Sequence, residues 1–484
     1  MTTISQWRLR AEFARRLSDM YGREVPAYTT LVDVSREVNT DVLARSGADA
    51  ERLGSISRVT AERHGAIRVG TPRELHQVAR IFGALGMHPV GFYDLREAAA
   101  SAVPVVSTAF RPVEAEELAR NPFRVFTSML TPADPRFFDA ELRGRLEEFL
   151  ARRQLFPPEL LDLADRAERE RELPEAAAER FLALAVGAFE LSGEPVDQSW
   201  YATLERVSAV AADIGGVTST HVNHLTPRVL DIDELYRRMT ERGIQMIDTI
   251  QGPPRWEGPD VLLRQTSFRA LSEPRAMRRD DGTVTTGALR VRFGEVEARG
   301  IALTAAGRAR YDGLLAEVDR RMAGRPATAR QDVASDVWRA GLPDTERGLV
   351  EAGLAFFTYH VSADRPAGAP PSARLSELLD RGWVSARPVV YEDFLPRSAA
   401  GIFQSNLSGE GTRDEAQQAV HYDLARLAGM IDREIHDPFA LYRRQQDQSL
   451  RRVAEELGLD DAPTAPDASP DEPRTPTTLT EDAR

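Results

Sequence analysis

The sequence contains few residue types that could bind a metal ion or act as a nucleophile. None of its 484 residues is Cys, which excludes thiolate nucleophiles, disulfides and thiolate-bound metals. It also lacks Lys, so all 62 basic residues are Arg, which excludes a Schiff-base lysine and a Walker-A phosphate loop. A metal site must therefore use Asp, Glu and the eight His residues.

Two of these histidines, His64 and His224, lie on predicted strands. Residues two apart on a strand share a face, so His64 shares its face with Arg68, and His224 shares its face with Arg228. On a regular strand His221 points away from His224, whereas a β-bulge would reverse the choice between them. A structural role for His64 or His224 is equally compatible with the pattern.

The five remaining histidines are expected to be structural or exposed. His76, His421 and His436 fall in predicted helices with polar neighbours, and His88 and His360 lie near the ends of turns or strands.

Two carboxylates, Glu295 and Glu297, share a face of another predicted strand. A buried carboxylate is costly unless it binds a cation or an arginine, so one of them is a candidate metal ligand. The alternative is an exposed charged face that pairs with Arg292 or Arg299. Two histidines and one carboxylate with open positions form the donor set of non-heme Fe(II) oxygenases.

The order of elements around His64 recurs around His224. A strand near His64 precedes a helix that begins at Pro72, and a strand near His224 precedes a helix that begins after Asp231; short strand-like segments follow each helix. This predicts an α+β protein with two β-α-β-β-β modules, at residues 56–110 and 216–304, which together form a metal-binding sheet.

The other segments are predicted to surround these modules. We expect helices at 1–55, a helical insertion at 111–215, a helix-rich part at 305–457, and a disordered acidic tail at 458–484. The net charge of −13 and the absence of a basic stripe argue against nucleic acid as a partner. We expect a cytoplasmic protein with no membrane partner, since no signal peptide or membrane span is recognisable. The pattern predicts no oligomeric state.

Three longer motifs carry a family resemblance. The segments 221–233, 293–304 and 391–406 resemble the 2-oxoadipate dioxygenase/decarboxylase family, and the similarity extends through nearly the whole chain up to the acidic tail. The resemblance implies a vicinal-oxygen-chelate-like core and an Fe(II) enzyme of lysine catabolism. Such an enzyme converts 2-oxoadipate and O₂ to (R)-2-hydroxyglutarate and CO₂.

The resemblance also implies site residues. The iron ligands correspond to His64, His224 and Glu295, with His221 and Glu297 as the alternatives, and Arg68 corresponds to the residue that binds the substrate carboxylate. Arg397 and Ser398 lie in the turn that contacts the substrate. The implied catalytic set is His64, Arg68, His224 and Glu295, and the implied partners are a 2-oxo diacid and O₂.

Two other function classes fit the same residues. A metal-dependent isomerase or lyase of the same fold would keep the ligands and need no O₂. A non-catalytic protein that binds a 2-oxo acid would keep the site without turnover.

Overall fold

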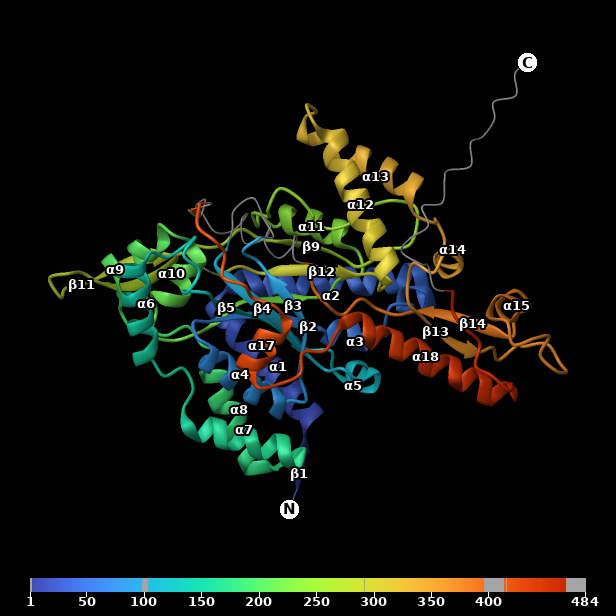
Figure 1. Ribbon diagram of the computed structural model, residues 1–484, viewed down its shortest axis with the longest axis horizontal. Coiled ribbons are helices and arrows are strands. Elements are labelled where there is room, and N and C mark those ends of the chain that lie inside the picture. The colour runs from blue at the N-terminus through green and yellow to red at the C-terminus, as the bar shows by residue number, and fades with distance from the viewer. Residues whose placement is uncertain (1, 98–102, 291, 396–412, 415, 467–484) are drawn as a thin grey trace. The chain divides into compact units, whose positions relative to one another are not determined.

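The computed structural model describes residues 2–97, 103–290, 292–395, 413–414 and 416–466 (Figure 1). Two of the predicted site residues, Arg397 and Ser398, and most of the predicted tail lie outside the described residues. The chain divides into two compact units. Unit 1 contains Met1–Gly252, Leu263–Arg299 and Glu392–Leu441, and unit 2 contains Pro253–Leu262, Gly300–Tyr391 and Tyr442–Arg484.

The first predicted module is present in unit 1 as β2 (Arg63–Val69), α4 (Pro72–Ala84), β3 (His88–Asp94), β4 (Val105–Arg111) and β5 (Arg124–Leu130). Helix α4 begins at a capping box, in which the Thr71 hydroxyl accepts from the Glu74 backbone N–H and the Glu74 carboxylate accepts from the Thr71 N–H. Strand β5 lies inside 111–215, the range expected to be a helical insertion, so the strands of this module continue past residue 110. It is buried throughout and lacks polar alternation, which weakens its strand signal.

The second module begins with β8 (Val222–Pro227) and α11 (Ile232–Glu241) and continues through β9 (Leu263–Ser267), β10 (Glu273–Arg278), β11 (Val284–Leu289) and β12 (Glu295–Arg299). Strand β8 joins the first module's sheet, whose order is β3-β4-β5-β2-β8. Strand β12 pairs with β9, and a bridge between Arg228 and Glu297 brings it beside the end of β8. The two modules therefore meet where β2, β8 and β12 adjoin. The mixed α+β architecture expected from the sequence is confirmed.

Helices and short strands surround these sheets in unit 1. They are β1 (Thr3–Ser5), α1 (Gln6–Glu24), α2 (Pro26–Ser46), the 3₁₀ helix η1 (Gly47–Glu51), α3 (Ile56–Ala61), α5 (Ala115–Arg120), α6 (Ala140–Arg152), α7 (Pro158–Glu170), β6 (Glu172–Pro174), α8 (Glu175–Gly187), β7 (Val196–Asp197), α9 (Gln198–Glu205), α10 (Ala209–Gly215) and α17 (Leu424–Ile431). Helix α4 packs against α7 and α17 as well as against the sheet (Figure 1). The hydrophobic core runs continuously from α1 and α2 through both sides of the five-stranded sheet.

Unit 2 is built from helices and one strand pair. Its elements are α12 (Ala305–Met322), the 3₁₀ helix η2 (Ala327–Ala329), α13 (Arg330–Gly341), α14 (Glu346–Glu351), β13 (Phe357–Val361), α15 (Leu375–Asp380) and β14 (Val384–Pro388), and helix α18 (Pro438–Leu457) begins in unit 1 and continues into unit 2. Tyr311 of α12 packs edge-on against the fully buried Trp338 of α13. None of the helices in the described part of the chain combines the length and apolar character needed to cross a bilayer.

Candidate functional site

Three buried side chains from three adjoining strands converge in unit 1. His64 lies on β2, His224 on β8 and Glu295 on β12, and each offers one ligand atom within 4.8 Å of the others. Nε2 of His64 lies 3.4 Å from one Glu295 oxygen, and Nδ1 of His224 lies 3.6 Å from the other. The structure thus brings together the three residues that the resemblance implied as ligands.

The register of β8 explains why His221 is separate. His224 lies opposite Ala66 and Val222 lies opposite Ile67, so β8 contains one additional residue, Asn223, at this point. Although this is the kind of bulge that could have exchanged the two histidines, His221 Nε2 lies 3.3 Å from Asp213 and outside the cluster.

Burial and charge give the two cluster histidines opposite pKa shifts. Burial lowers the pKa of His224 to about 4, so its imidazole is neutral near pH 7, the form in which histidine binds a metal. Burial also acts to lower the pKa of His64, but Glu297 and Glu295 outweigh it and the net shift is upward. The neighbouring carboxylates therefore make His64 a stronger base than His224.

Glu297 occupies the position behind His64. One of its oxygens lies 3.0 Å from Nδ1 of His64, the ring nitrogen on the side away from Glu295. Arg299 donates to both Glu297 oxygens at 2.6 and 2.9 Å, and Arg124 donates at 3.3 Å. Burial would raise the pKa of Glu297, but Arg299, His64 and Arg124 hold it well below its usual range. Glu297 is thus an ionised carboxylate beside the imidazole, as is common behind metal-bound histidines.

A buried ionic network continues beyond Glu297. Arg124 is fully buried and donates to Glu62 at 2.7 Å and to Glu392 at 2.5 Å. Arg228 donates to the other Glu62 oxygen at 2.9 Å, and Arg58 donates to Glu392. Arg228 therefore belongs to this network and not to the cluster of His64, His224 and Glu295, although the sequence places it on the same strand face as His224.

Arg68 lies beyond His64 on β2 and is buried in a second polar cluster. It donates to Asp213, at the end of α10, at 2.5 Å. Asn223 donates to the same Asp213 oxygen at 2.9 Å, and His221 approaches the other oxygen. Burial opposes ionisation of Asp213, but His221 and Arg68 lower its pKa. Asp213 was not predicted from the sequence, where its only signal is that it is a single acidic residue in the apolar segment 209–215.

Aromatic rings enclose the histidines. Phe394 packs edge-on against His64 with ring centroids 5.0 Å apart, and Phe126 packs against Phe394 at the same separation. Phe293 packs against His224 at 5.2 Å. These apolar surfaces limit water access and strengthen electrostatic interactions inside the site.

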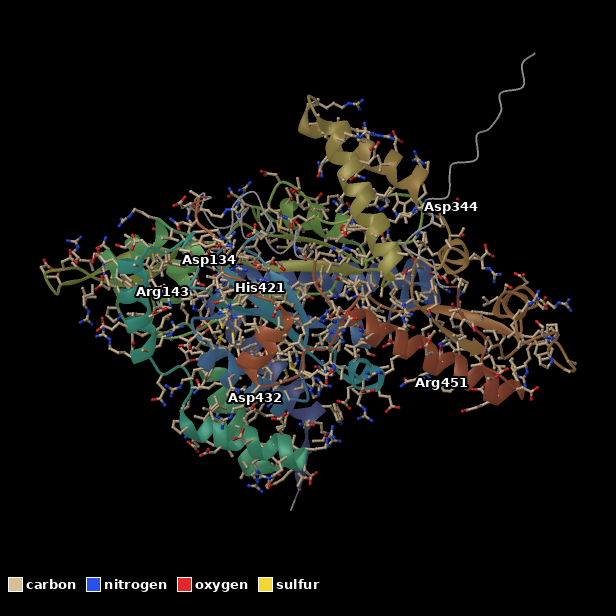
Figure 2. The ribbon with its side chains drawn as sticks, viewed as in Figure 1. Asp134, Arg143, Asp344, His421, Asp432 and Arg451 are labelled. Carbon is tan, nitrogen blue, oxygen red and sulfur yellow. The ribbon has the colours of Figure 1, made fainter. Side chains whose placement is uncertain are left out.

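The other histidines lie apart from the cluster. The side chain of His421, labelled in Figure 2, is 83% exposed and faces Asp423. Nδ1 of His76 lies 3.0 Å from the carbonyl oxygen of Ile431, and the ring of His88 packs against that of His436.

The donor set fits a divalent transition metal. Two imidazoles and one carboxylate from separate strands leave coordination positions for other ligands, which is the arrangement of facial-triad sites. Nδ1 of His224 is buried and has no hydrogen-bond partner among the described residues, as expected of a nitrogen meant for a metal.

Comparisons with known proteins show which family the chain resembles. A family model described as 2-oxoadipate dioxygenase/decarboxylase matches residues 13–406. The chain is 58% identical over 434 residues to a protein of that name from Mycobacterium bovis, a match that covers 90% of this chain and 95% of the relative. It is 40% identical over 466 residues to a protein of the same name from Pseudomonas putida, covering 94% and 98%.

The backbone is similar to a solved structure of the hydroxyglutarate synthase from Pseudomonas putida in complex with 2-oxoadipate. The TM-score is 0.82 at 38% identity, and the match covers 94% of this chain and 99% of that one. The residues matched by the family model, 13–406, include the strands that hold His64 and His224.

Proposed function

The chain belongs to the 2-oxoadipate dioxygenase/decarboxylase family, and from this premise we propose that it converts 2-oxoadipate and O₂ to (R)-2-hydroxyglutarate and CO₂. The observation that carries the proposal is the convergence of His64, His224 and Glu295 from two modules into one buried cluster. The names of the relatives and the bound 2-oxoadipate in the Pseudomonas putida structure support the substrate.

The metal of this site is proposed to be Fe(II), held by His64, His224 and Glu295. Ferrous iron supplies the redox chemistry that O₂ activation requires and binds a 2-oxo acid by chelation. The reaction balances without a second reductant, because the six-carbon oxo diacid provides the electrons that reduce O₂. One oxygen atom enters the new carboxylate that replaces the lost CO₂, and the other becomes the hydroxyl of the five-carbon product.

The protein groups orient the substrate and exclude water. Arg68 is proposed to bind the distal carboxylate, since it is buried on the same strand as His64 and its planar guanidinium fork matches the geometry of a carboxylate. Asp213 and Asn223 would hold that fork in place. Arg397 and Ser398, which lie outside the described residues, remain proposed substrate contacts on the ground of the family resemblance alone. A place in lysine catabolism is proposed on the same ground.

The experiment is to load the full-length chain with Fe(II) anaerobically, add 2-oxoadipate and admit air. We expect equal amounts of O₂ consumed, CO₂ released and 2-hydroxyglutarate formed. Conversion of 2-oxoadipate without O₂ uptake would instead support a metal-dependent isomerase or lyase, and tight binding without conversion would support a 2-oxo-acid-binding protein.

A further inference from the structure

Arg275 of β10 differs from the other buried arginines. It is only 8% exposed, yet among the described residues no carboxylate forms an ion pair with it and its Nε has no hydrogen-bond partner. Every other buried arginine in the described chain pairs with a carboxylate. For example, Arg96 and Arg136 share Asp134, which is labelled in Figure 2.

A buried cation without a counterion is costly to the fold. Burial lowers the pKa of Arg275 and the nearby positive charge of Arg292 lowers it further, but an arginine keeps its proton near pH 7. Arg292 is itself paired with Glu24 and Glu273, so these carboxylates are already engaged. Glu273, Glu24 and Asp213 act in the opposite direction, but none of them forms an ion pair with Arg275. The free energy lost by burying the Arg275 charge is therefore only partly recovered within the described protein.

The Arg275 side chain lines a pocket of about 500 Å³ in unit 1, a size typical of small-molecule sites. We name it the Arg275 pocket. Its wall is formed by the turn at 216–219, the segment 192–197, Phe149 and Arg278. No member of the His64 cluster lines it, but the next residue after this turn, Thr220, donates to the backbone carbonyl of Arg68. The Arg275 pocket is therefore separate from the cluster of His64, His224 and Glu295 and adjacent to β2, the strand that carries Arg68.

Two carboxylates also line the pocket, but each already has a hydrogen-bond partner. Glu194 accepts from the Thr218 hydroxyl, and Asp197 accepts from the Trp200 backbone N–H at the start of α9. Like Arg275, the exposed Arg278 forms no ion pair among the described residues.

We propose that the Arg275 pocket binds the oxyanion group of a small molecule, a carboxylate or a phosphate, through the guanidinium of Arg275. The planar fork of an arginine matches both groups, and the bound anion would provide the counterion that the fold lacks. Ser219 adds a hydroxyl at the pocket wall. This inference does not depend on the proposed reaction.

The test titrates the full-length protein with two probes, inorganic phosphate and glutarate, by calorimetry and by the shift in thermal midpoint at constant ionic strength. The wild type should bind at least one probe and gain thermal stability from it. Binding to phosphate alone identifies a phosphate site, and binding to glutarate alone identifies a carboxylate site. Arg275→Gln should weaken binding about tenfold or more, the factor that a charge-assisted hydrogen bond contributes.

The matched control is Arg279→Gln, which removes an exposed arginine four residues along the same chain segment and outside the pocket. It should leave affinity unchanged. Without anion, Arg275→Gln should be as stable as the wild type or more stable, because a buried uncompensated charge is removed. Arg275→Lys keeps the charge but loses the planar fork of the guanidinium. Its affinity for the anion should fall between those of the wild type and Arg275→Gln.

Three results would overturn the proposal. The first is a wild type whose midpoint and titrations respond to neither probe. The second is binding that Arg275→Gln and Arg279→Gln change equally. The third is glutarate binding that survives Arg275→Gln but is lost in Arg68→Gln, which would assign that binding to the site around Arg68.

Discussion

At the scale of single residues, the cluster assigns different roles to chemically identical side chains. His64 and His224 lie with Glu295, whereas His221 lies with Asp213 and Glu297 lies behind His64. We therefore expect substitution of His64, His224 or Glu295 by Ala to abolish Fe(II) retention with the fold intact, since a facial site has only three protein ligands. Iron content after anaerobic loading and the circular dichroism spectrum check this. Retention of iron in His224→Ala together with its loss in His221→Ala would contradict the assignment.

Glu297 should tune the metal site without being a ligand. Its carboxylate faces Nδ1 of His64, so Glu297→Gln should leave the three ligands in place but weaken metal affinity about 10- to 100-fold, the usual effect of removing the carboxylate behind a metal-bound histidine. Competition with a chelator of known affinity measures this. His221→Ala is the matched control and should bind the metal as the wild type does; equal affinities in both variants would show that Glu297 has only a structural role.

Arg68 should determine the preference for a diacid. Arg68→Ala should raise KM for 2-oxoadipate by a factor that corresponds to about 2–5 kcal/mol, the range for truncating one partner of a buried charge pair. Iron content should stay normal, and discrimination against 2-oxohexanoate, which lacks the distal carboxylate, should shrink. Asp213→Asn should produce a smaller rise in KM because it removes the group that orients Arg68. Loss of iron, or equal losses on both substrates, would show that Arg68 supports the metal-bearing strand instead.

At the scale of elements, the strands that carry His64, His224 and Glu295 could be predicted from the sequence. The side chains that contact the site residues from other elements could not. Period-two alternation on a strand places His64 and Arg68 on one face, and the structure confirms that both are buried on β2. Asp213 belongs to a helix 145 residues further along the chain, and no local pattern indicates that pairing. The position of the bulge at Asn223 could not be predicted either, because the pattern of apolar and polar residues does not show where a strand contains an extra residue.

The buried network that connects β2, β5 and β12 should make stability depend on pH. Burial would raise the pKa of Glu62, but Arg124 and Arg228 hold it well below its usual range. The contribution of Glu62 to the free energy of unfolding is therefore complete above its unfolded-state pKa of about 4.3. It is lost progressively as pH falls from that value through the lower pKa of the folded state. Glu62→Gln should lower stability near pH 7 by about 3–5 kcal/mol, because it leaves Arg228 without its carboxylate.

Urea unfolding at a series of pH values from neutral to acid tests this. The Glu62→Gln curve should be flatter than the wild-type curve on the acid side. Glu159→Gln removes a carboxylate that pairs with Arg180 on the surface, and it should change the stability and its pH dependence much less because solvent screens an exposed pair. Parallel curves for Glu62→Gln and the wild type would mean that Glu62 does not carry the linkage.

At the scale of the whole molecule, the two β-α-β-β-β modules create the site only by adjoining. Strand β8 of the second module completes the sheet of the first, and β12 lies beside the end of β8, so the ligands come from both modules. Neither module supplies all three ligands. We infer that the sequence elements around His64 and His224 together specify one shared site, which could not be recognised from either module alone.

Labelling with heavy oxygen can show whether this site uses O₂ to convert 2-oxoadipate. The Fe(II)-loaded chain is given 2-oxoadipate under isotopically heavy oxygen gas, and the product is analysed by mass spectrometry, with Glu295→Ala as the inactive control. We expect 2-hydroxyglutarate that carries both heavy oxygen atoms, one in the hydroxyl and one in the new carboxylate. Unlabelled product, or product formed equally well without oxygen, would contradict it.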